Sequence, residues 1–349
     1  MAEDTGNWTN LTGVDYDGWD PDTDPPLSCY SVHNEYTTKA YLVPIYQIIG
    51  PILVNLCALS VIGNTVILCT VFFIRKKHLT PTLMFSLSLA GADAVAAMSM
   101  GLGFFVNNIL LLNFDINIAY RDCIVLVVES FRLATMVCSA LHFLMLAVNH
   151  WLGIIRPLHY ASRMTRKLAW ICIVVMWVSP LVGFFAVFSL MPGRGFRSTK
   201  CQDVEFAHRF PFRAAVSALF FIPVTLMSVV YVHVFIVLYF HRKRLLSLDV
   251  TGSNNDEKRR MQSNTKALVT TLIILLTYLI GWLPAVINYV LVCDGCIFPL
   301  TISLCIRLPT NIVTNLLIVL KFLVDPIIYT ARIQEVRMVI NYPLRKQID

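Results

Sequence analysis

Residues 168–190 read LAWICIVVMWVSPLVGFFAVFSL, a run without a single charged side chain. A helix needs about 20 consecutive apolar residues to cross the hydrocarbon core of a bilayer, and this run supplies them. A transmembrane barrel would instead show strands of about 10 residues in which apolar and polar side chains alternate, and this run does not alternate. The run therefore predicts a helix that spans a membrane.

Six further apolar runs of the same kind lie on either side of it. They are Val43–Phe73, Leu83–Leu111, Cys123–His150, Ala214–Phe240, Ala267–Val292 and Leu308–Tyr329. The last run is the weakest, because Lys321 and Asp325 lie inside it. The chain is 57% hydrophobic and only 14% charged, whereas a soluble domain carries about 25% charged residues. We therefore predict an all-α bundle of seven transmembrane helices over residues 43–329.

Clusters of basic residues give the predicted orientation of this bundle. They follow the first, third, fifth and seventh runs: Arg75, Lys76 and Lys77; Arg156, Arg163, Arg166 and Lys167; Arg242, Lys243, Arg244, Lys258, Arg259, Arg260 and Lys266; Arg332, Arg337, Arg345 and Lys346. Cytoplasmic loops carry such an excess of arginine and lysine, so we expect a multi-pass protein of the plasma membrane whose N-terminus is extracellular. Topology also explains the net charge of +7, so we expect no nucleic-acid partner.

The two ends of the chain differ in composition. Residues 1–42 hold eight acidic residues against one base, and sequons at Asn7 and Asn10; they predict a disordered, glycosylated extracellular tail. No apolar signal segment precedes the first run, so the first membrane helix is expected to direct insertion. Residues 330–349 predict a short amphipathic eighth helix on the inner leaflet and a short tail. Its apolar face would hold Ile333, Val336, Val339 and Ile340, with Arg332 and Arg337 toward the headgroups.

Short motifs occur in a fixed order along the seven runs. They are Gly63-Asn64, Leu87-Ser88-Leu89-Ala90-Gly91-Ala92-Asp93, Ile155-Arg156-Pro157-Leu158-His159-Tyr160, Trp177 with Pro180, Pro223 with Tyr231, Gly281-Trp282-Leu283-Pro284, and Asp325-Pro326-Ile327-Ile328-Tyr329. Each motif alone is weak. Together they resemble the rhodopsin-like (class A) G-protein-coupled receptors. The resemblance implies a cell-surface receptor whose partners are an extracellular ligand, a heterotrimeric G protein and the bilayer, with no enzyme activity and no cofactor.

The chain departs from the family pattern at the end of the third run. Asn149-His150-Trp151 stands where the family usually has Asp/Glu-Arg-Tyr, at the positions that, with Pro157, contact the G protein. Cys123 lies 26 residues before Asn149 (149 − 123), two more than is usual. The displaced cysteine and the aspartate of the last motif resemble the melanocortin, lysophospholipid and cannabinoid branch.

Ten cysteines divide by location. Cys57, Cys69, Cys138 and Cys172 lie within the runs and are expected to be free apolar residues. Cys29, Cys123, Cys201, Cys293 and Cys296, with Cys305 at the margin, face the oxidising exterior. Pairing cannot be read from sequence; the resemblance favours a Cys123–Cys201 bridge. The CxxC spacing of Cys293 and Cys296 lacks a second ligand pair, so no metal site is expected.

Ionisable residues inside the membrane are candidates for function. In the resembled family the position of Asp93, with that of Ser139, binds sodium and couples to activation. Lys321 replaces the asparagine that completes this cluster, and it shares a helix face with Asp325. We expect its ammonium within salt-bridge reach of Asp93 or Asp325, where sodium would otherwise lie. The alternatives are that Lys321 snorkels to the surface or pairs only with Asp325.

Other residues of the expected activation switch come from the family pattern. Trp282 sits beside Pro284, where the missing backbone hydrogen bond lets the helix pivot. Gly281 replaces the cysteine usual before this tryptophan. Tyr231 and Tyr329 are expected to exchange hydrogen bonds near the cytoplasmic end when the helices move. Proline is common in membrane helices without any switch, so the pattern alone assigns these roles.

Four residues are expected to bind ligand: Glu129, Arg132, Trp282 and Tyr289. Arg132 stands where amine receptors of the family hold their ligand with an aspartate, so it repels an amine. Further bases lie in the loop after the fourth run: Arg194, Arg197, Lys200 and Arg209. They favour an anionic small molecule, a lipid or a peptide with a carboxylate. The alternatives are a simple Glu129–Arg132 salt bridge and a solvated basic loop.

Two other classes of function remain open on sequence alone. A receptor-like decoy or scaffold that binds but couples weakly is favoured by Asn149-His150-Trp151. A channel or transporter is favoured only by the charges inside the membrane, and the lack of an internal repeat weakens a transporter built from duplicated halves. The sequence holds neither a Walker loop nor a Gly-x-Ser-x-Gly elbow, so we expect no enzyme.

Overall fold

The computed structural model describes residues 35–74, 79–116, 118–248, 255–293, 296–298 and 304–345. The sequons at Asn7 and Asn10, the cysteine at position 29 and much of the basic loop after the fifth run lie outside these residues. Within them, every long element is a helix.

Seven helices are long and apolar enough to cross a membrane, which confirms the predicted all-α fold. They are α1 (Glu35–Cys69), α2 (Pro81–Phe104), α3 (Arg121–Ile155), α5 (Arg166–Leu190), α6 (Phe210–Leu248), α7 (Asn255–Leu291) and α8 (Leu304–Arg332). The π-helix Phe105–Asn113 continues α2, and α4 (Pro157–Arg163) is a short helix between α3 and α5. The first helix thus begins before the apolar run that predicts it.

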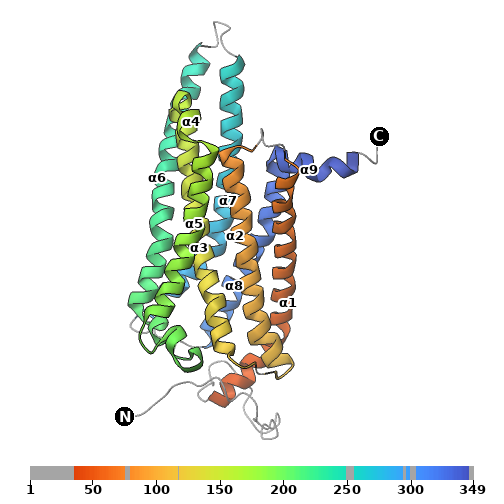
Figure 1. Cartoon of the computed structure of the whole chain (residues 1–349), viewed down its shortest axis with the longest axis vertical. Helices are drawn as coiled ribbons and strands as arrows, with labels where there is room; N and C mark the ends of the chain where they lie inside the picture. The colour runs from red at the N-terminus through yellow and green to blue at the C-terminus, as the bar shows by residue number, and fades with distance from the viewer. Residues whose placement is uncertain are drawn as a thin grey trace.

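A separate amphipathic helix follows α8, as the sequence predicts. The chain breaks at Ile333, and α9 (Gln334–Arg345) follows, turning away from the bundle axis (Figure 1). Val336 is fully buried against the bundle, while Arg332 and Arg337 are exposed. This is the apolar and basic division that the spacing predicts.

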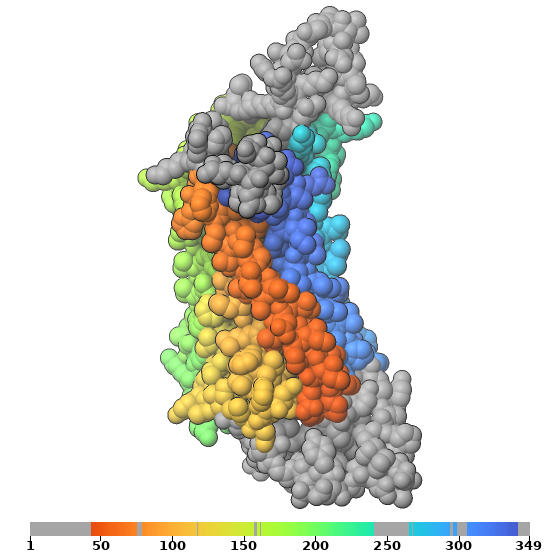
Figure 2. All heavy atoms as spheres, turned by 90° about the vertical axis from the view of Figure 1, so that its right-hand side faces the viewer, coloured from red at the N-terminus to blue at the C-terminus, as the bar shows by residue number. Residues whose placement is uncertain are grey.

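The third membrane helix runs through the centre of the bundle. In the most apolar part of α3, 61% of residues are buried, against 22–44% in the other six helices. The outer helices expose apolar side chains instead, as lipid contact requires. Figure 2 shows α1 lying obliquely across one face of the molecule beside α8. Polar residues on the inward faces of α2, α3, α7 and α8 therefore meet one another rather than lipid.

Caps explain where two membrane helices begin. The Thr80 hydroxyl accepts a hydrogen bond from the Leu83 amide at 3.3 Å, and Pro81 fills the first helical position of α2. The Thr165 hydroxyl caps α5 in the same way, through the Leu168 amide at 3.2 Å. Such caps satisfy amides that a helix start leaves without partners.

Candidate functional site

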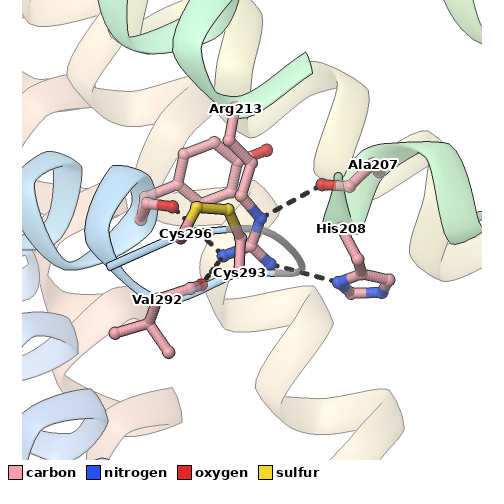
Figure 3. Close-up of a disulfide and its surroundings, with 7 residues drawn as sticks. Ala207, His208, Arg213, Val292, Cys293 and Cys296 are labelled. Atoms are coloured by element: carbon pink, nitrogen blue, oxygen red, sulfur yellow. Dashed lines mark hydrogen bonds between the residues drawn. A yellow bond between two sulfur atoms is a disulfide. The ribbon is translucent and has the colours of Figure 1, made fainter. Parts of the chain in front are cut away.

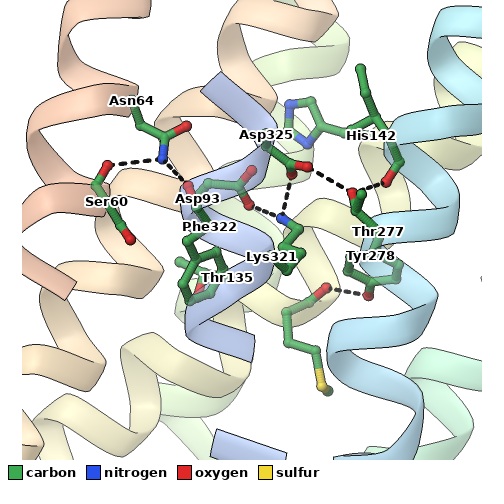
Figure 4. Close-up of polar contacts among 12 residues, drawn as sticks. Ser60, Asn64, Asp93, Thr135, His142, Thr277, Tyr278, Lys321, Phe322 and Asp325 are labelled. Atoms are coloured by element: carbon green, nitrogen blue, oxygen red, sulfur yellow. Dashed lines mark hydrogen bonds and ion pairs between the residues drawn. The ribbon is translucent and has the colours of Figure 1, made fainter. Parts of the chain in front are cut away.

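An ion cluster lies at the centre of the bundle (Figure 4). The Lys321 ammonium on α8 pairs with Oδ1 of Asp93 on α2, and it lies 3.1 Å from Oδ2 of Asp325, one turn along α8. All three side chains are at most 1% exposed. The expected ion pairs are confirmed, and both alternatives for Lys321 are wrong: it does not reach the surface, and Asp325 is not its only partner.

Helix α7 supplies polar groups around this cluster that the sequence did not single out. The Thr277 hydroxyl lies 2.6 Å from Oδ1 of Asp325 and 2.7 Å from the carbonyl oxygen of Ile274 in its own helix, so its one proton is shared between these two acceptors. The Tyr278 hydroxyl donates to the Met136 carbonyl of α3 at 3.0 Å, and the Tyr278 ring centre lies 5.8 Å from the Lys321 ammonium. In the sequence, a threonine about one turn before Gly281-Trp282-Leu283-Pro284 only weakly indicates a functional residue. The packing of α7 on α8 is what reveals the Thr277–Asp325 contact.

Asn64 contacts the backbone beside the ion cluster, whereas Ser139 makes no hydrogen bond to it. Asn64 on α1 donates through Nδ2 to the Phe322 carbonyl of α8 at 2.9 Å, which holds the backbone beside Lys321. Ser139 is buried in α3, but it makes no hydrogen bond within the part of the chain that the structure describes. Thr277, not Ser139, is the hydroxyl that contacts an acid of this cluster.

The expected pivot residues are packed in the core. Trp282 is 1% exposed, and its ring centre lies 6.3 Å from that of Phe322, next to Lys321. Helix α7 continues through Pro284. The buried hydroxyls of Tyr231 and Tyr329 have no hydrogen-bond partner among the described residues. These two tyrosines therefore do not exchange a hydrogen bond in this conformation.

Hydrogen bonds join the Asn149-His150-Trp151 segment of α3 to the neighbouring helices. Asn149 donates to the Thr82 hydroxyl at 2.8 Å and accepts from the Tyr160 hydroxyl at 2.9 Å. Desolvation raises the pKa of Tyr160, which lies outside the membrane spans, and keeps its hydroxyl protonated. These bonds join α3 to α2 and α4.

The next two residues tie α3 to the helices on its other side. Nε2 of His150 lies 2.9 Å from the Thr271 hydroxyl of α7, and Nε1 of Trp151 donates to Nδ1 of His233 on α6 at 2.9 Å. Pro157 begins α4, and its side chain is not among those described. Three of the four expected G-protein contacts thus hold the ends of α2, α4, α6 and α7 together.

A cavity of about 440 Å³ opens at this end of the bundle. Its lining includes Thr80, Ser86, Asn149, His150, Lys266 and Arg332. The two basic residues come from the segments that the positive-inside rule assigns to the cytoplasm. The expected G-protein contacts Asn149 and His150 therefore lie in the wall of a cavity of mixed polar and apolar lining, which holds two basic residues and the acidic Glu335.

At the opposite end, two cysteines fix the loop between α5 and α6 to the start of α3. Cys123 and Cys201 form a disulfide with their Cα atoms 5.0 Å apart, which confirms the favoured bridge. Cys293 and Cys296 are also paired, directly after α7. Aromatic rings hold the same loop against the helices: Phe196 stacks with Phe185 at 6.0 Å.

The expected ligand residues on α3 form an ion pair. Nε of Arg132 donates to Oε2 of Glu129 at 2.7 Å, and a second guanidinium nitrogen contacts the other carboxylate oxygen. Both side chains remain partly exposed, at 25% and 34%. Tyr289 lies near the end of α7, where its ring faces the Arg213 guanidinium of α6. Trp282 lies deeper, at the central cluster.

The basic loop is partly neutralised by its own acids. Nε of Arg194 lies 3.7 Å from Oδ2 of Asp203, and Arg209 donates to Oε1 of Glu205. The Arg209 hydrogen bond and charge lower the pKa of the Glu205 carboxyl. The loop therefore offers less positive charge to a ligand than its arginine count suggests.

Arg213 is the residue at this end that the sequence did not indicate. Near the start of α6, its Nη1 donates to the carbonyls of Tyr289 (3.1 Å) and Val292, and its Nε donates to that of Ala207 at 3.2 Å (Figure 3). Its guanidinium carbon lies 4.5 Å from the Tyr289 ring centre. Carbonyls at a helix end lack intrahelical partners, and a cation there also favours the helix dipole. Arg213 thus caps the end of α7.

Comparison with known proteins completes the description of this site. The family model described as 7 transmembrane receptor (rhodopsin family) matches residues 63–329. Trace amine-associated receptor 13c of Danio rerio is 25% identical over 276 residues, covering 76% of this chain and 78% of its own length. Octopamine receptor beta-2R of Chilo suppressalis is 25% identical, covering 71% and 69%. Melanocortin receptor 3 of Rattus norvegicus is also 25% identical, covering 80% and 79%.

The identity of these relatives does not separate the branches of the family, because the amine and melanocortin receptors named here are each 25% identical to the chain. The matched region nonetheless holds the central ion cluster, the Asn149-His150-Trp151 segment and the Cys123–Cys201 bridge. The family is one of multi-pass receptors that couple to G proteins, and none of the named relatives is an enzyme. This chain belongs to the rhodopsin-like family of G-protein-coupled receptors.

Proposed function

We propose that this chain is a plasma-membrane receptor with an extracellular N-terminus that binds a non-amine ligand between α3 and α7 and activates a heterotrimeric G protein at the opposite end. The observation that carries the proposal is the cavity beside Asn149 and His150, because a coupling receptor needs an opening on its cytoplasmic side. Lys266 and Arg332 outnumber the one acid of its lining, Glu335, and so favour a carboxylate-bearing segment of the partner.

The ligand class follows from Arg132. An arginine at the position where amine receptors of the family carry an aspartate disfavours a simple amine there, although two of the three relatives named above are named for amines. Glu129 occupies two nitrogens of this guanidinium, so the ligand must compete with it. An anionic small molecule, lipid or peptide carboxylate can do so, because it forms the same charge-assisted hydrogen bonds.

A ligand screen that reads G-protein dissociation tests this proposal. Anionic compounds should activate the unaltered chain, and Arg132→Gln should abolish the response at equal surface expression. Amines that activate it while carboxylates do not would contradict the ligand class. Ionic current without G-protein dissociation would instead favour a channel. Since every relative named above is a receptor, the alternative of a decoy has no support from them.

A tag at the N-terminus tests the orientation. It should be reachable by antibody on intact cells, and Asn7→Gln with Asn10→Gln should remove the mass that a glycosidase removes. A tag reachable only at the C-terminus would reverse the topology.

A further inference from the structure

One face of α7 contacts both ends of the Lys321–Asp325 turn of α8. The Thr277 hydroxyl bridges Asp325 and the Ile274 carbonyl of its own helix, and Gly281, one turn further along, lies against Lys321 (Figure 4 shows the Thr277 contacts). Residues four apart lie on the same side of a helix. Helix α7 therefore meets the ion cluster through two residues that stand one above the other.

Gly281 sets how closely α7 approaches α8 at this level. A Cβ atom at position 281 would lie 2.9 Å from Cβ and 3.3 Å from Cγ of Lys321, and 3.4 Å from the Leu317 carbonyl oxygen. These atoms belong to the stem of the side chain and to the backbone, so they cannot rotate out of the way. Any larger residue at 281 must push the two helices apart beside the ammonium.

The charges of the cluster make the Thr277 hydrogen bond important. Two carboxylates share one ammonium, and all three groups are at most 1% exposed. Oδ2 of Asp93 has no hydrogen-bond partner among the described residues. Buried charge is costly unless it is paired and hydrogen-bonded. Thr277 supplies a donor to this acid-rich cluster from a helix that carries none of its charges.

We propose that Thr277 and Gly281 are positioning residues of the Asp93–Lys321–Asp325 cluster, and that through them the cluster latches α7 to α8 in the closed bundle. Movement of α7 away from α8 breaks the Thr277–Asp325 bond and the Gly281–Lys321 contact together. Helix α7 also lines the cavity beside Asn149 and His150, through Lys266 and other residues of its first part. This role of the latch rests on the proposed function, in which displacement of α7 widens the cavity for the G protein.

Four substitutions separate a latch from a merely structural contact. Thr277→Val removes the hydroxyl and keeps the shape, while Thr277→Ser keeps the hydroxyl. Gly281→Ala adds the Cβ that collides with Lys321. Gly183→Ala is its matched control, since nothing lies within 4 Å of a Cβ at Gly183 in α5.

A fifth variant controls for the loss of a buried hydroxyl. Thr135 is 1% exposed and bonds only to carbonyls of its own helix, those of Phe131 and Arg132. Thr135→Val therefore removes a buried hydroxyl without releasing one helix from another.

Two measurements test the latch and the proposed function separately. The first is ligand-independent G-protein dissociation per receptor on the cell surface, which should rise about tenfold in Thr277→Val, the loss expected for a hydrogen bond to a charged group. The second is the distance between spin labels at Val269 on α7 and Leu168 on α5 in purified protein, which are both exposed. Cys69 and Cys172 are replaced by serine beforehand.

The expected result is a longer label distance in Thr277→Val and Gly281→Ala, and an unchanged distance in Thr277→Ser, Thr135→Val and Gly183→Ala. Should Thr277→Val fail to fold, the comparison of Gly281→Ala with Gly183→Ala tests the latch in its place. Unchanged distances in both altered variants would overturn the latch, as would an equal change in the controls. Longer distances without G-protein dissociation in any variant would uphold the latch and contradict the proposed function.

Discussion

The Lys321 ammonium of α8 pairs with the Asp93 carboxylate of α2 across the middle of the bundle, and neither side chain is more than 1% exposed. The cation that two buried carboxylates require is therefore part of the chain itself. Asp325 shares the same ammonium at 3.1 Å. A covalently attached cation has no dissociation equilibrium, so we expect the cluster not to respond to the concentration of a free ion in the way that an open site would.

The first prediction concerns sodium. Ligand binding and the thermal unfolding midpoint of the unaltered chain should not change when sodium replaces choline at constant ionic strength. Lys321→Asn removes the ammonium and leaves two carboxylates that attract a free cation. Its unfolding midpoint should rise with sodium concentration. A strong sodium effect on the unaltered chain, or none on the variant, would contradict the substitution of sodium by Lys321.

The second prediction concerns the stability of the same cluster. Lys321→Met fills the space with an apolar side chain and leaves Asp93 and Asp325 without a counter-charge. Breaking one partner out of a buried ion pair costs roughly 3–5 kcal/mol, so little folded protein should be recovered from detergent extracts. Arg121, which pairs only with its neighbour Asp122, provides the control. Arg121→Met should unfold at the temperature of the unaltered chain, and equal recovery of both variants would refute the prediction.

The third prediction tests the Cys123–Cys201 bridge. Cys201→Ser should lower the free energy of unfolding by about 2–5 kcal/mol, because the bridge closes a loop with a sequence separation of 78 residues. Surface expression should fall with it, and mild reduction of the unaltered chain should reproduce the effect. Cys69→Ser is the control, since Cys69 is free and exposed. Equal thermal unfolding of the two variants would show that the bridge contributes nothing.

The fourth prediction concerns Asn149, which holds Thr82 and Tyr160 by two hydrogen bonds. Asn149→Leu removes both bonds; because Thr82 and Tyr160 are only partly buried, each loss should cost no more than the lower end of the roughly 1–3 kcal/mol of a buried unsatisfied group. Asn149→Asp should keep most of the stability, because both hydroxyls can donate to a carboxylate. Asn55, whose amide bonds only to the Pro51 carbonyl of its own helix, is the control. A thermal unfolding midpoint of Asn149→Leu that is equal to or higher than that of Asn55→Leu would contradict the role of Asn149 in joining α3 to α2 and α4.

The fifth prediction concerns the Arg213 cap on α7. Arg213→Lys keeps the charge but loses the planar fork that reaches several carbonyls at once. Amide hydrogen exchange at residues 286–293 should therefore accelerate in the variant, and the unfolding midpoint should fall by about 2–4 °C for each kcal/mol lost. Exchange that stays at the rate of the unaltered chain would show that the end of α7 does not depend on the guanidinium.

The helices could be predicted because their signal is local. Each apolar run contains its own membrane span, and Lys321 and Asp325 could be paired because they stand one turn apart on one helix. The Lys321–Asp93 pair was expected because Lys321 stands where an asparagine completes the sodium site of the resembled family, and because two buried carboxylates repel without a counter-charge. In each case the residue type itself indicates the free-energy cost: apolar side chains avoid water, and charged side chains avoid lipid.

The contacts that sequence missed depend on how helices pack. Thr277, Gly281 and Arg213 gain their roles only when α7 lies against α8 and α6. Ser139 was expected at the ion cluster by position, but it makes no hydrogen bond in the described residues. The neighbours of Asn149 and His150 likewise come from three other helices. A single sequence carries no record of these distances.

The hydrogen bonds of His150 with Thr271 and of Trp151 with His233 have a consequence for how the bundle responds to its medium. Water competes directly for such bonds, and the cavity beside His150 is large enough to hold water. We therefore expect osmotic pressure to act on the proposed opening of the bundle: solutes too large for the cavity should draw water out and favour the closed form.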